Sequence, residues 1–148
     1  MMQQDLPPHA YIPGQTPRHA EGAFDSLRAT ARPGMTEAEL AASPAMAAGL
    51  RFLHAGFGWE AHEVLEPVWM ACPPNSPARQ MAQALIQIAN ARLKDRMEQL
   101  AAAARLRRIA ARHLAEAQLG QGGACGGVIL GLDPSTVADW IESANNAI

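Results

Sequence analysis

The sequence predicts an all-α protein: a compact multi-helix array or bundle preceded by a Pro-rich N-terminal arm. Of its 148 residues, 49% are hydrophobic but only 5% are aromatic, and roughly a fifth are alanine. Val, Ile and Thr together number 15, too few to cover the faces of a β-sheet. Alanine is the strongest helix former because it loses no side-chain entropy on ordering. A chain of this length is expected to form one domain with its own core.

The charge balance argues against a nucleic-acid partner. There are 12 Lys and Arg residues against 14 Asp and Glu residues, so the formal net charge is −2. A strongly basic nucleic-acid-binding protein is therefore not indicated. Arg105, Arg108 and Arg112 form a basic strip at helical spacing, which we interpret as a solvated helix face.

The cysteines and the apolar runs predict a cytoplasmic protein that does not enter a membrane. Cys72 and Cys125 lie far apart without C-x-x-C spacing, which is typical of free thiols in a reducing compartment. The first residues show no basic start followed by an apolar run, so no secretory signal is apparent. The longest apolar runs, such as Leu100–Ala104, fall far short of the ~20 residues that span a bilayer.

The chain begins with a segment that lacks a helical pattern. Residues 1–16 contain several prolines and predict an extended arm, either disordered or laid across the body of the protein. Residues 17–148 are then expected to form a single helical domain. Thr16 followed by Pro17 resembles an N-cap with proline at the first helical position, which predicts a helix to about Ala31.

Further capping signals divide the middle of the chain into helices. Thr36 and Glu39 form a capping box that starts a short helix. Ser43-Pro44 predicts another helix that continues towards Ala55. After an interruption by two glycines, residues 59–72 have a helical pattern again.

The second half of the chain begins with the longest helical region. Ser76-Pro77 opens this region, which extends to about Leu119. Because a small domain rarely contains so long a single rod, we expect a turn near Arg96–Gln99. A Gly-rich connection over 120–127 follows, and Asp133-Pro134-Ser135 caps a final helix.

Bulky and polar residues share an unexpected stripe on the predicted helix 59–72. At 100° per residue, this stripe lies opposite the apolar arc of the helix, and it contains Trp59, His62, Glu66 and Trp69, with Glu63 at its edge. Glu60 alone points away from both the stripe and the arc. The two tryptophans would shield His62 and Glu66 from water, which strengthens their interaction and perturbs their pKa values.

Pro67 lies inside the same helix and predicts a bend. Proline has no N–H to donate to the carbonyl of Glu63, so that acceptor is left free. A bend beside a histidine and a glutamate suits a pocket, and it equally suits a helix that wraps around a core.

The next helix carries a matching polar stripe. Gln83, Gln87, Asn90 and Lys94, the only lysine of the chain, recur at i, i+4, i+7 and i+11 and share one face. Amides both donate and accept hydrogen bonds, which suits a network with carboxylates and an imidazole. A hairpin over 73–76 would make the two helices antiparallel and let their stripes face each other.

These residues resemble the domain-of-unknown-function 309 family. The resemblance rests on Gly49, Gly56, Trp59-Glu60-Ala61-His62-Glu63-Val64-Leu65-Glu66, Trp69 and Gln83-Ala84-Leu85-Ile86-Gln87-Ile88-Ala89, and it covers about 45–118. It implies a compact multi-helix array with a helix break near Arg96–Gln99, and members are often labelled predicted metal-dependent hydrolases. The chain departs from the family pattern at Leu53-His54, at Ala84 and at Lys94, which lies near a position where many relatives have histidine.

The first functional hypothesis is a metal-dependent hydrolase. His62-Glu63-x-x-Glu66 resembles the H-E-x-x-H pattern, in which residues i and i+4 bind a metal and residue i+1 is the general base. His62 and Glu66 would then bind a divalent cation, and Glu63 would be the catalytic base that activates a metal-bound water. A catalytic zinc site normally uses three protein ligands. The third would come from His54, His19, His9 or a carboxylate, and the spacing does not choose among them.

The second hypothesis is a non-catalytic helical module that binds a ligand or forms a homo-oligomer. In it, His62 and Glu66 form a structural hydrogen bond between the tryptophan rings. The same residues then line a polar pocket for an unknown small molecule: Trp59, His62, Glu66, Trp69, Gln83, Gln87, Asn90 and Lys94.

Overall fold

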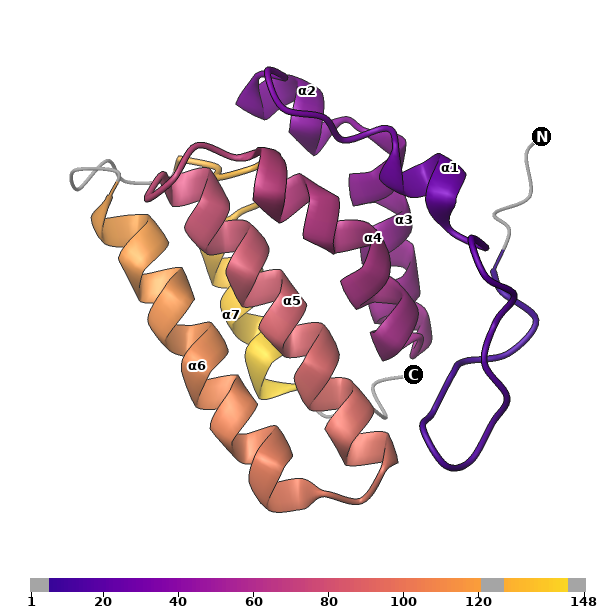
Figure 1. Ribbon diagram of the computed structural model, residues 1–148. Helices are drawn as coiled ribbons and strands as arrows, with labels where there is room; N and C mark the ends of the chain where they lie inside the picture. Colours follow the sequence, from indigo (N-terminus) through magenta and orange to yellow (C-terminus); the bar gives the residue numbers. More distant parts are fainter. Residues whose placement is uncertain (1–5, 121–126, 144–148) are drawn as a thin grey trace.

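The computed structural model describes residues 6–120 and 127–143. Within these ranges the chain forms seven helices and no strand, which confirms the predicted all-α class. The helices are α1 (Asp25–Arg28), α2 (Glu37–Ala41), α3 (Pro44–Ala55), α4 (Gly58–Ala71), α5 (Pro77–Arg96), α6 (Leu100–Leu119) and α7 (Pro134–Glu142). Figure 1 shows the long α5 and α6 side by side, with α4 crossing between α5 and α3. Most of the predicted Gly-rich connection lies outside the described residues.

The helix predicted from Thr16 to about Ala31 is wrong, because only α1 forms there. The Thr16 hydroxyl accepts a hydrogen bond from the Ile12 N–H and donates one to the Ala10 carbonyl, both at 2.8 Å. It closes a turn that precedes it, so it cannot cap a helix that follows it. Gly22 then adopts a positive φ of 77°, a conformation that an α-helix does not contain.

The other capping predictions are confirmed. The hydroxyls of Ser43 and Ser76 accept hydrogen bonds from the backbone N–H groups three residues later, at the starts of α3 and α5. Thr36 and Glu39 form the full capping box of α2. The predicted turn also occurs, since α5 ends at Arg96 and α6 begins at Leu100.

The core forms where α4 packs between α3 and α5. On α4 the predicted apolar arc is buried, and it includes Ala61, Val64, Leu65 and Val68. Gly58 lies so close to α5 that a Cβ atom there would be 2.7 Å from the Ala89 carbonyl oxygen. Small residues therefore set the spacing of this helix pair.

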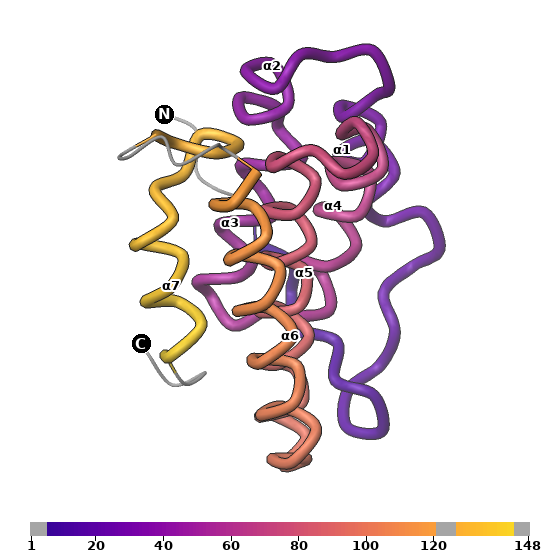
Figure 2. The backbone as a smooth tube through the Cα atoms, turned by 90° about the vertical axis from the view of Figure 1, so that its left-hand side faces the viewer, coloured from indigo at the N-terminus to yellow at the C-terminus, as the bar shows by residue number. Residues whose placement is uncertain are grey.

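The N-terminal segment and α7 cover opposite sides of the array, as Figure 2 shows. Residues 6–24 contain no helix and cross the face of α4. The described part of the arm is therefore laid across the body of the protein, which is one of the two predicted alternatives. The segment brings histidine and tyrosine side chains to α4 from outside the helical core. This placement creates the largest pocket described below.

Cys72 is a buried free cysteine at the end of α4. Burial, followed by the nearby charge of Glu37, raises the pKa of its thiol to about 11, although Arg79 opposes the shift. The thiol is therefore protonated at neutral pH and unreactive. Cys125 lies outside the described residues. Among the helices that the structure describes, none has the length and apolar character needed to cross a membrane.

Candidate functional site

The polar side chains of α4 divide between two neighbours. Trp59, Glu60 and Glu63 face the N-terminal segment and α1. His62, Glu66 and Trp69 line a groove against α5. The predicted stripe is therefore divided between two cavities.

The groove between α4 and α5, here called the His62 groove, collects most of the predicted pocket. It is open, with a volume of about 190 Å³, and is lined by His62, Glu66, Trp69, Gln83, Ile86, Gln87 and Asn90. All of these except Ile86 belong to the predicted set, so the two polar stripes do face each other. What these residues do stays a prediction.

His62 is held by α5 and not by its own helix. Its Nδ1 lies 2.9 Å from the Asn90 Oδ1, and the Asn90 amide nitrogen lies 3.4 Å from the Gln87 Oε1. Because an amide oxygen only accepts, Nδ1 carries the proton in this arrangement. The prediction of a hydrogen bond between His62 and Glu66 is wrong, because each side chain has another partner. The Glu66 carboxylate instead lies 3.4 Å from the Arg28 guanidinium, an oppositely charged partner.

Three predicted residues lie outside the His62 groove. Trp59 packs edge-on against Tyr11, with ring centroids 5.3 Å apart, and does not line the groove with His62. Glu63 pairs with Arg28 of α1. The side chain of Lys94, further along α5, makes no hydrogen bond or ion pair with any residue of 6–120 or 127–143.

The donor set of the His62 groove does not fit a catalytic metal. The Asn90 bond leaves the His62 Nε2 available, as in many metal sites. However, no group of three or more His, Cys, Asp or Glu residues that could hold a metal occurs within the described ranges.

The residues considered as a third ligand are engaged elsewhere. His54 packs against the ring of Trp140 at 4.6 Å. His9 donates to the Pro17 carbonyl at 2.8 Å, and His19 pairs with Glu60. The hypothesis that His62 and Glu66 hold a metal for Glu63 therefore lacks the third donor that a catalytic zinc needs.

Glu60 is the most unusual acidic residue of the structure. Its side chain is 0% exposed, and one carboxylate oxygen, Oε2, accepts from the Tyr11 N–H at 2.7 Å and lies 2.5 Å from the His19 Nε2. The other oxygen, Oε1, is buried and has no hydrogen-bond partner among residues 6–120 and 127–143. Buried carboxylates are tolerated when charge-assisted hydrogen bonds compensate them. Glu60 thus fastens the N-terminal segment to α4.

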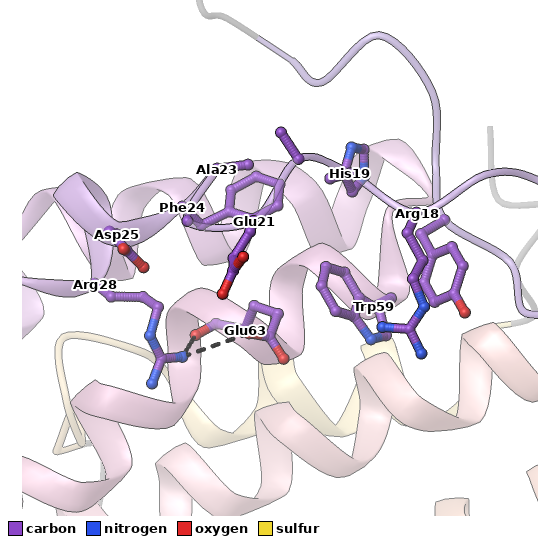
Figure 3. A pocket seen from close by; sticks show the side chains of 12 residues that line it. Arg18, His19, Glu21, Ala23, Phe24, Asp25, Arg28, Trp59 and Glu63 are labelled. Carbon is purple, nitrogen blue, oxygen red and sulfur yellow. Dashed lines mark hydrogen bonds and ion pairs between the residues drawn. The ribbon is translucent and has the colours of Figure 1, made fainter.

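The fastened segment completes a pocket of about 550 Å³, here called the N-terminal pocket (Figure 3). Its lining includes Tyr11, Arg18, His19, Phe24, Trp59 and Glu63. The His19 side chain is only 7% exposed. The His19 Nε2 pairs with the Glu60 carboxylate, and the Nδ1 of the ring takes no part in that pair.

Aromatic rings pack against one another around this pocket. Trp59 lies within 6.2 Å of both His19 and Phe24, measured between ring centroids, and His9 stacks on His19 at 4.8 Å. Such ring pairs add stability beyond their buried area. These contacts hold the aromatic side chains of the pocket in place, although the pocket is open to solvent.

Arg28 connects the pocket to the proline of α4. Pro67 leaves the Glu63 carbonyl without its helical donor, as the sequence predicts, and the Arg28 guanidinium donates to that oxygen. The same guanidinium lies 3.7 Å from the Glu63 carboxylate. The proline therefore creates a docking point for α1 at the edge of the N-terminal pocket.

Sequence reasoning considered His19 only as a third metal ligand, and it missed the contacts of Glu60 with His19 and with the Tyr11 N–H. Helical spacing compares residues within one helix, whereas His19 is 41 positions before Glu60. The one available signal was the position of Glu60 outside both faces of its helix, which a partner from elsewhere in the chain could occupy. Nothing in the pattern of residues 6–24 identifies that partner.

The comparison with protein families agrees with the resemblance found in the sequence. The family described as "Domain of unknown function (DUF309)" matches residues 46–106. Over this segment, which is less than half of the chain, the protein is similar to the DUF309 family. The segment contains most of α3, all of α4 and α5 and the start of α6, including Glu60 and the His62 groove, whereas Tyr11 and His19 precede it. No curated protein and no solved structure matches the chain.

Proposed function

We propose that this protein is a non-catalytic helical module that binds a small organic molecule in the N-terminal pocket. In this proposal the His62 groove is a structural network between α4 and α5. The observation that carries the proposal is the pocket that Trp59 and the buried His19 form where the N-terminal segment crosses α4.

The size and lining of the N-terminal pocket suit a small ligand. Its volume of about 550 Å³ lies inside the range of about 300–1,000 Å³ that is usual for such sites. Aromatic rings supply apolar contact, while several charged groups can orient a ligand. A few convergent polar groups on an apolar wall are typical of binding sites.

The metal-dependent hydrolase is less well supported by the same geometry. It requires Glu63 beside a metal held by His62 and Glu66, yet Glu63 lines the N-terminal pocket and is paired with Arg28. The proposed base and the proposed ligand His62 thus belong to different cavities.

Replacing His62 by alanine tests the structural role of the groove. We expect His62→Ala to lower the free energy of unfolding by about 1 kcal/mol through loss of the Asn90 hydrogen bond. We also expect calorimetric titration with Zn²⁺ or Mn²⁺ to be indistinguishable between this variant and the wild type. Stoichiometric metal binding that His62→Ala abolishes would support the hydrolase and contradict the proposal.

Replacing Trp59 by alanine tests the N-terminal pocket as a binding site. Benzylamine, benzoate and benzyl alcohol are the probes, and binding is followed by NMR chemical-shift changes in the full chain. We expect at least one probe to shift the Trp59 indole and His19 signals, and we expect Trp59→Ala to weaken its binding at least about tenfold through lost apolar contact.

Two further variants make this result specific. Trp69→Ala removes a tryptophan of the same helix that lines the His62 groove, and it should leave probe binding unchanged. Trp59→Phe keeps an aromatic wall and should retain most of the affinity. Probe-induced shifts that cluster in the His62 groove, or that are absent for all three probes at millimolar concentration, would contradict the proposed function.

A further inference from the structure

The N-terminal pocket contains charged groups of both signs that have no charged partner. Among the residues that the structure describes, Glu21 and Asp25 make no side-chain hydrogen bond or ion pair, and Arg18 makes no ion pair. The Arg18 guanidinium lies over the face of Tyr11, at 5.7 Å from the ring centroid. These three groups are therefore available to a ligand.

The remaining charges of the pocket are already engaged. Arg28 pairs with Glu63 and Glu66, and His19 pairs with Glu60. The charge that a ligand meets is thus one guanidinium and two carboxylates.

The available charges are spread across the aromatic wall. In Figure 3 the Glu21 carboxylate reaches towards Glu63 beside Phe24, whereas Arg18 lies on the other side of Trp59. A cationic group of a ligand would therefore be stabilised at one end of the pocket and an anionic group at the other. The indole between them offers contact to an apolar or aromatic part.

From this arrangement we infer that the pocket takes a zwitterionic molecule, with an amine and a carboxylate separated by an apolar or aromatic group, as in a short peptide. This inference rests on the proposed binding function and adds the chemical class of the ligand. The ammonium group would lie near Glu21, and the carboxylate would pair with Arg18.

A ligand with a single charge fits the pocket less well. A simple anion would satisfy Arg18 but would bring a like charge towards Glu21 and Asp25. A simple cation would leave the guanidinium without a partner, although guanidinium and carboxylate form the strongest hydrogen-bonded pairs. Only a molecule with both charges uses all of the available groups.

A set of four related dipeptides tests the inference with the full chain. The parent is L-phenylalanyl-glycine, and the others are its N-acetyl derivative, its C-terminal amide and the doubly blocked peptide. Binding is measured by calorimetry and by the NMR signals of Trp59 and His19. We expect blocking either end to weaken binding about tenfold, the usual effect of losing one charge-assisted hydrogen bond.

Two variants assign each end of the peptide to its residue. Arg18→Gln should abolish the difference between the parent and the amide, and Glu21→Gln should reduce the difference between the parent and the N-acetyl peptide. Arg32→Gln and Glu116→Gln remove exposed charges that do not line the pocket and should change nothing. Raising NaCl to 0.5 M should weaken the parent peptide but not the doubly blocked one.

The outcomes separate the ligand class from the binding function. Equal affinity of the parent and the doubly blocked peptide overturns the zwitterionic class while leaving the pocket as a binding site. Absence of binding by all four peptides also overturns the class. The binding function is tested independently: it fails if benzylamine, benzoate and benzyl alcohol all cause no NMR chemical-shift changes.

Discussion

Replacing Glu60 by alanine is expected to release the N-terminal segment from α4 while the helical core stays folded. The substitution removes both hydrogen bonds of Oε2, so the Tyr11 N–H loses its acceptor and His19 loses its carboxylate. Losing charge-assisted bonds of this kind destabilises the attached structure by about 2 kcal/mol. That value corresponds to about a 30-fold rise in the population of the detached segment.

Hydrogen exchange at the Tyr11 amide measures this release directly. In Glu60→Ala we expect its protection to fall about 30-fold, while the amides of α5 keep theirs. The probes of the N-terminal pocket should bind less tightly in the same variant, because the segment supplies most of the lining. Unchanged protection at Tyr11 would show that other contacts hold the segment.

The isosteric variant Glu60→Gln separates hydrogen bonding from charge. Its carbonyl oxygen can still accept from both the Tyr11 N–H and the His19 Nε2, and its amide nitrogen replaces the unpartnered Oε1. If neutral hydrogen bonds suffice, Glu60→Gln keeps the segment docked. If the negative charge is required, it behaves as Glu60→Ala does. Glu116→Ala, on the exposed face of α6, is the control and should have no effect on the segment.

Capping signals in the sequence predicted the starts of α3 and α5 correctly, but the same signal failed at Thr16. Ser43 and Ser76 each have a proline next to them and form the expected hydrogen bonds to the N–H three residues on. Thr16 has the same neighbour, yet its hydroxyl is engaged by Ile12 and Ala10 in the preceding turn. The signal is thus identical in all three places, and competition from a local turn decides the outcome.

Predictions about the site succeeded where two consecutive long helices meet, and they failed where a partner comes from the N-terminal part of the chain, which is mostly not helical. Helical spacing and a short hairpin were enough to bring His62 and Asn90 together across α4 and α5. They could not show that Arg28 would engage Glu66, or that His19 would engage Glu60, because those partners come from non-helical segments or a short helix far earlier in the chain. Tertiary contacts of this kind leave no periodic trace in a sequence.

Replacing Gly58 by alanine is expected to destabilise the packing of α4 on α5. The new Cβ would lie 2.7 Å from the Ala89 carbonyl oxygen and 3.2 Å from the Leu93 backbone nitrogen. Backbone atoms cannot rotate away, so the two helices must move apart. Overpacking of this kind costs about 3 kcal/mol, against a gain of about 1 kcal/mol from the better helix propensity of alanine. We expect a net loss of about 2 kcal/mol in a urea unfolding experiment.

Gly49→Ala is a matched control on the neighbouring helix α3. There the new Cβ would meet the Leu65 side chain, with its Cδ2 at 2.5 Å, and not a backbone atom. Leu65 is fully buried and its Cγ would also lie at 2.6 Å, so its side chain must shift within the core. Because a side chain shifts more easily than a backbone carbonyl, we expect Gly49→Ala to lose about 1 kcal/mol, less than Gly58→Ala, although its contact is nominally shorter. A larger loss for Gly49→Ala than for Gly58→Ala would contradict this reasoning. It would show that the packing around Leu65 limits substitution of these glycines more than the approach of the α4 and α5 backbones does.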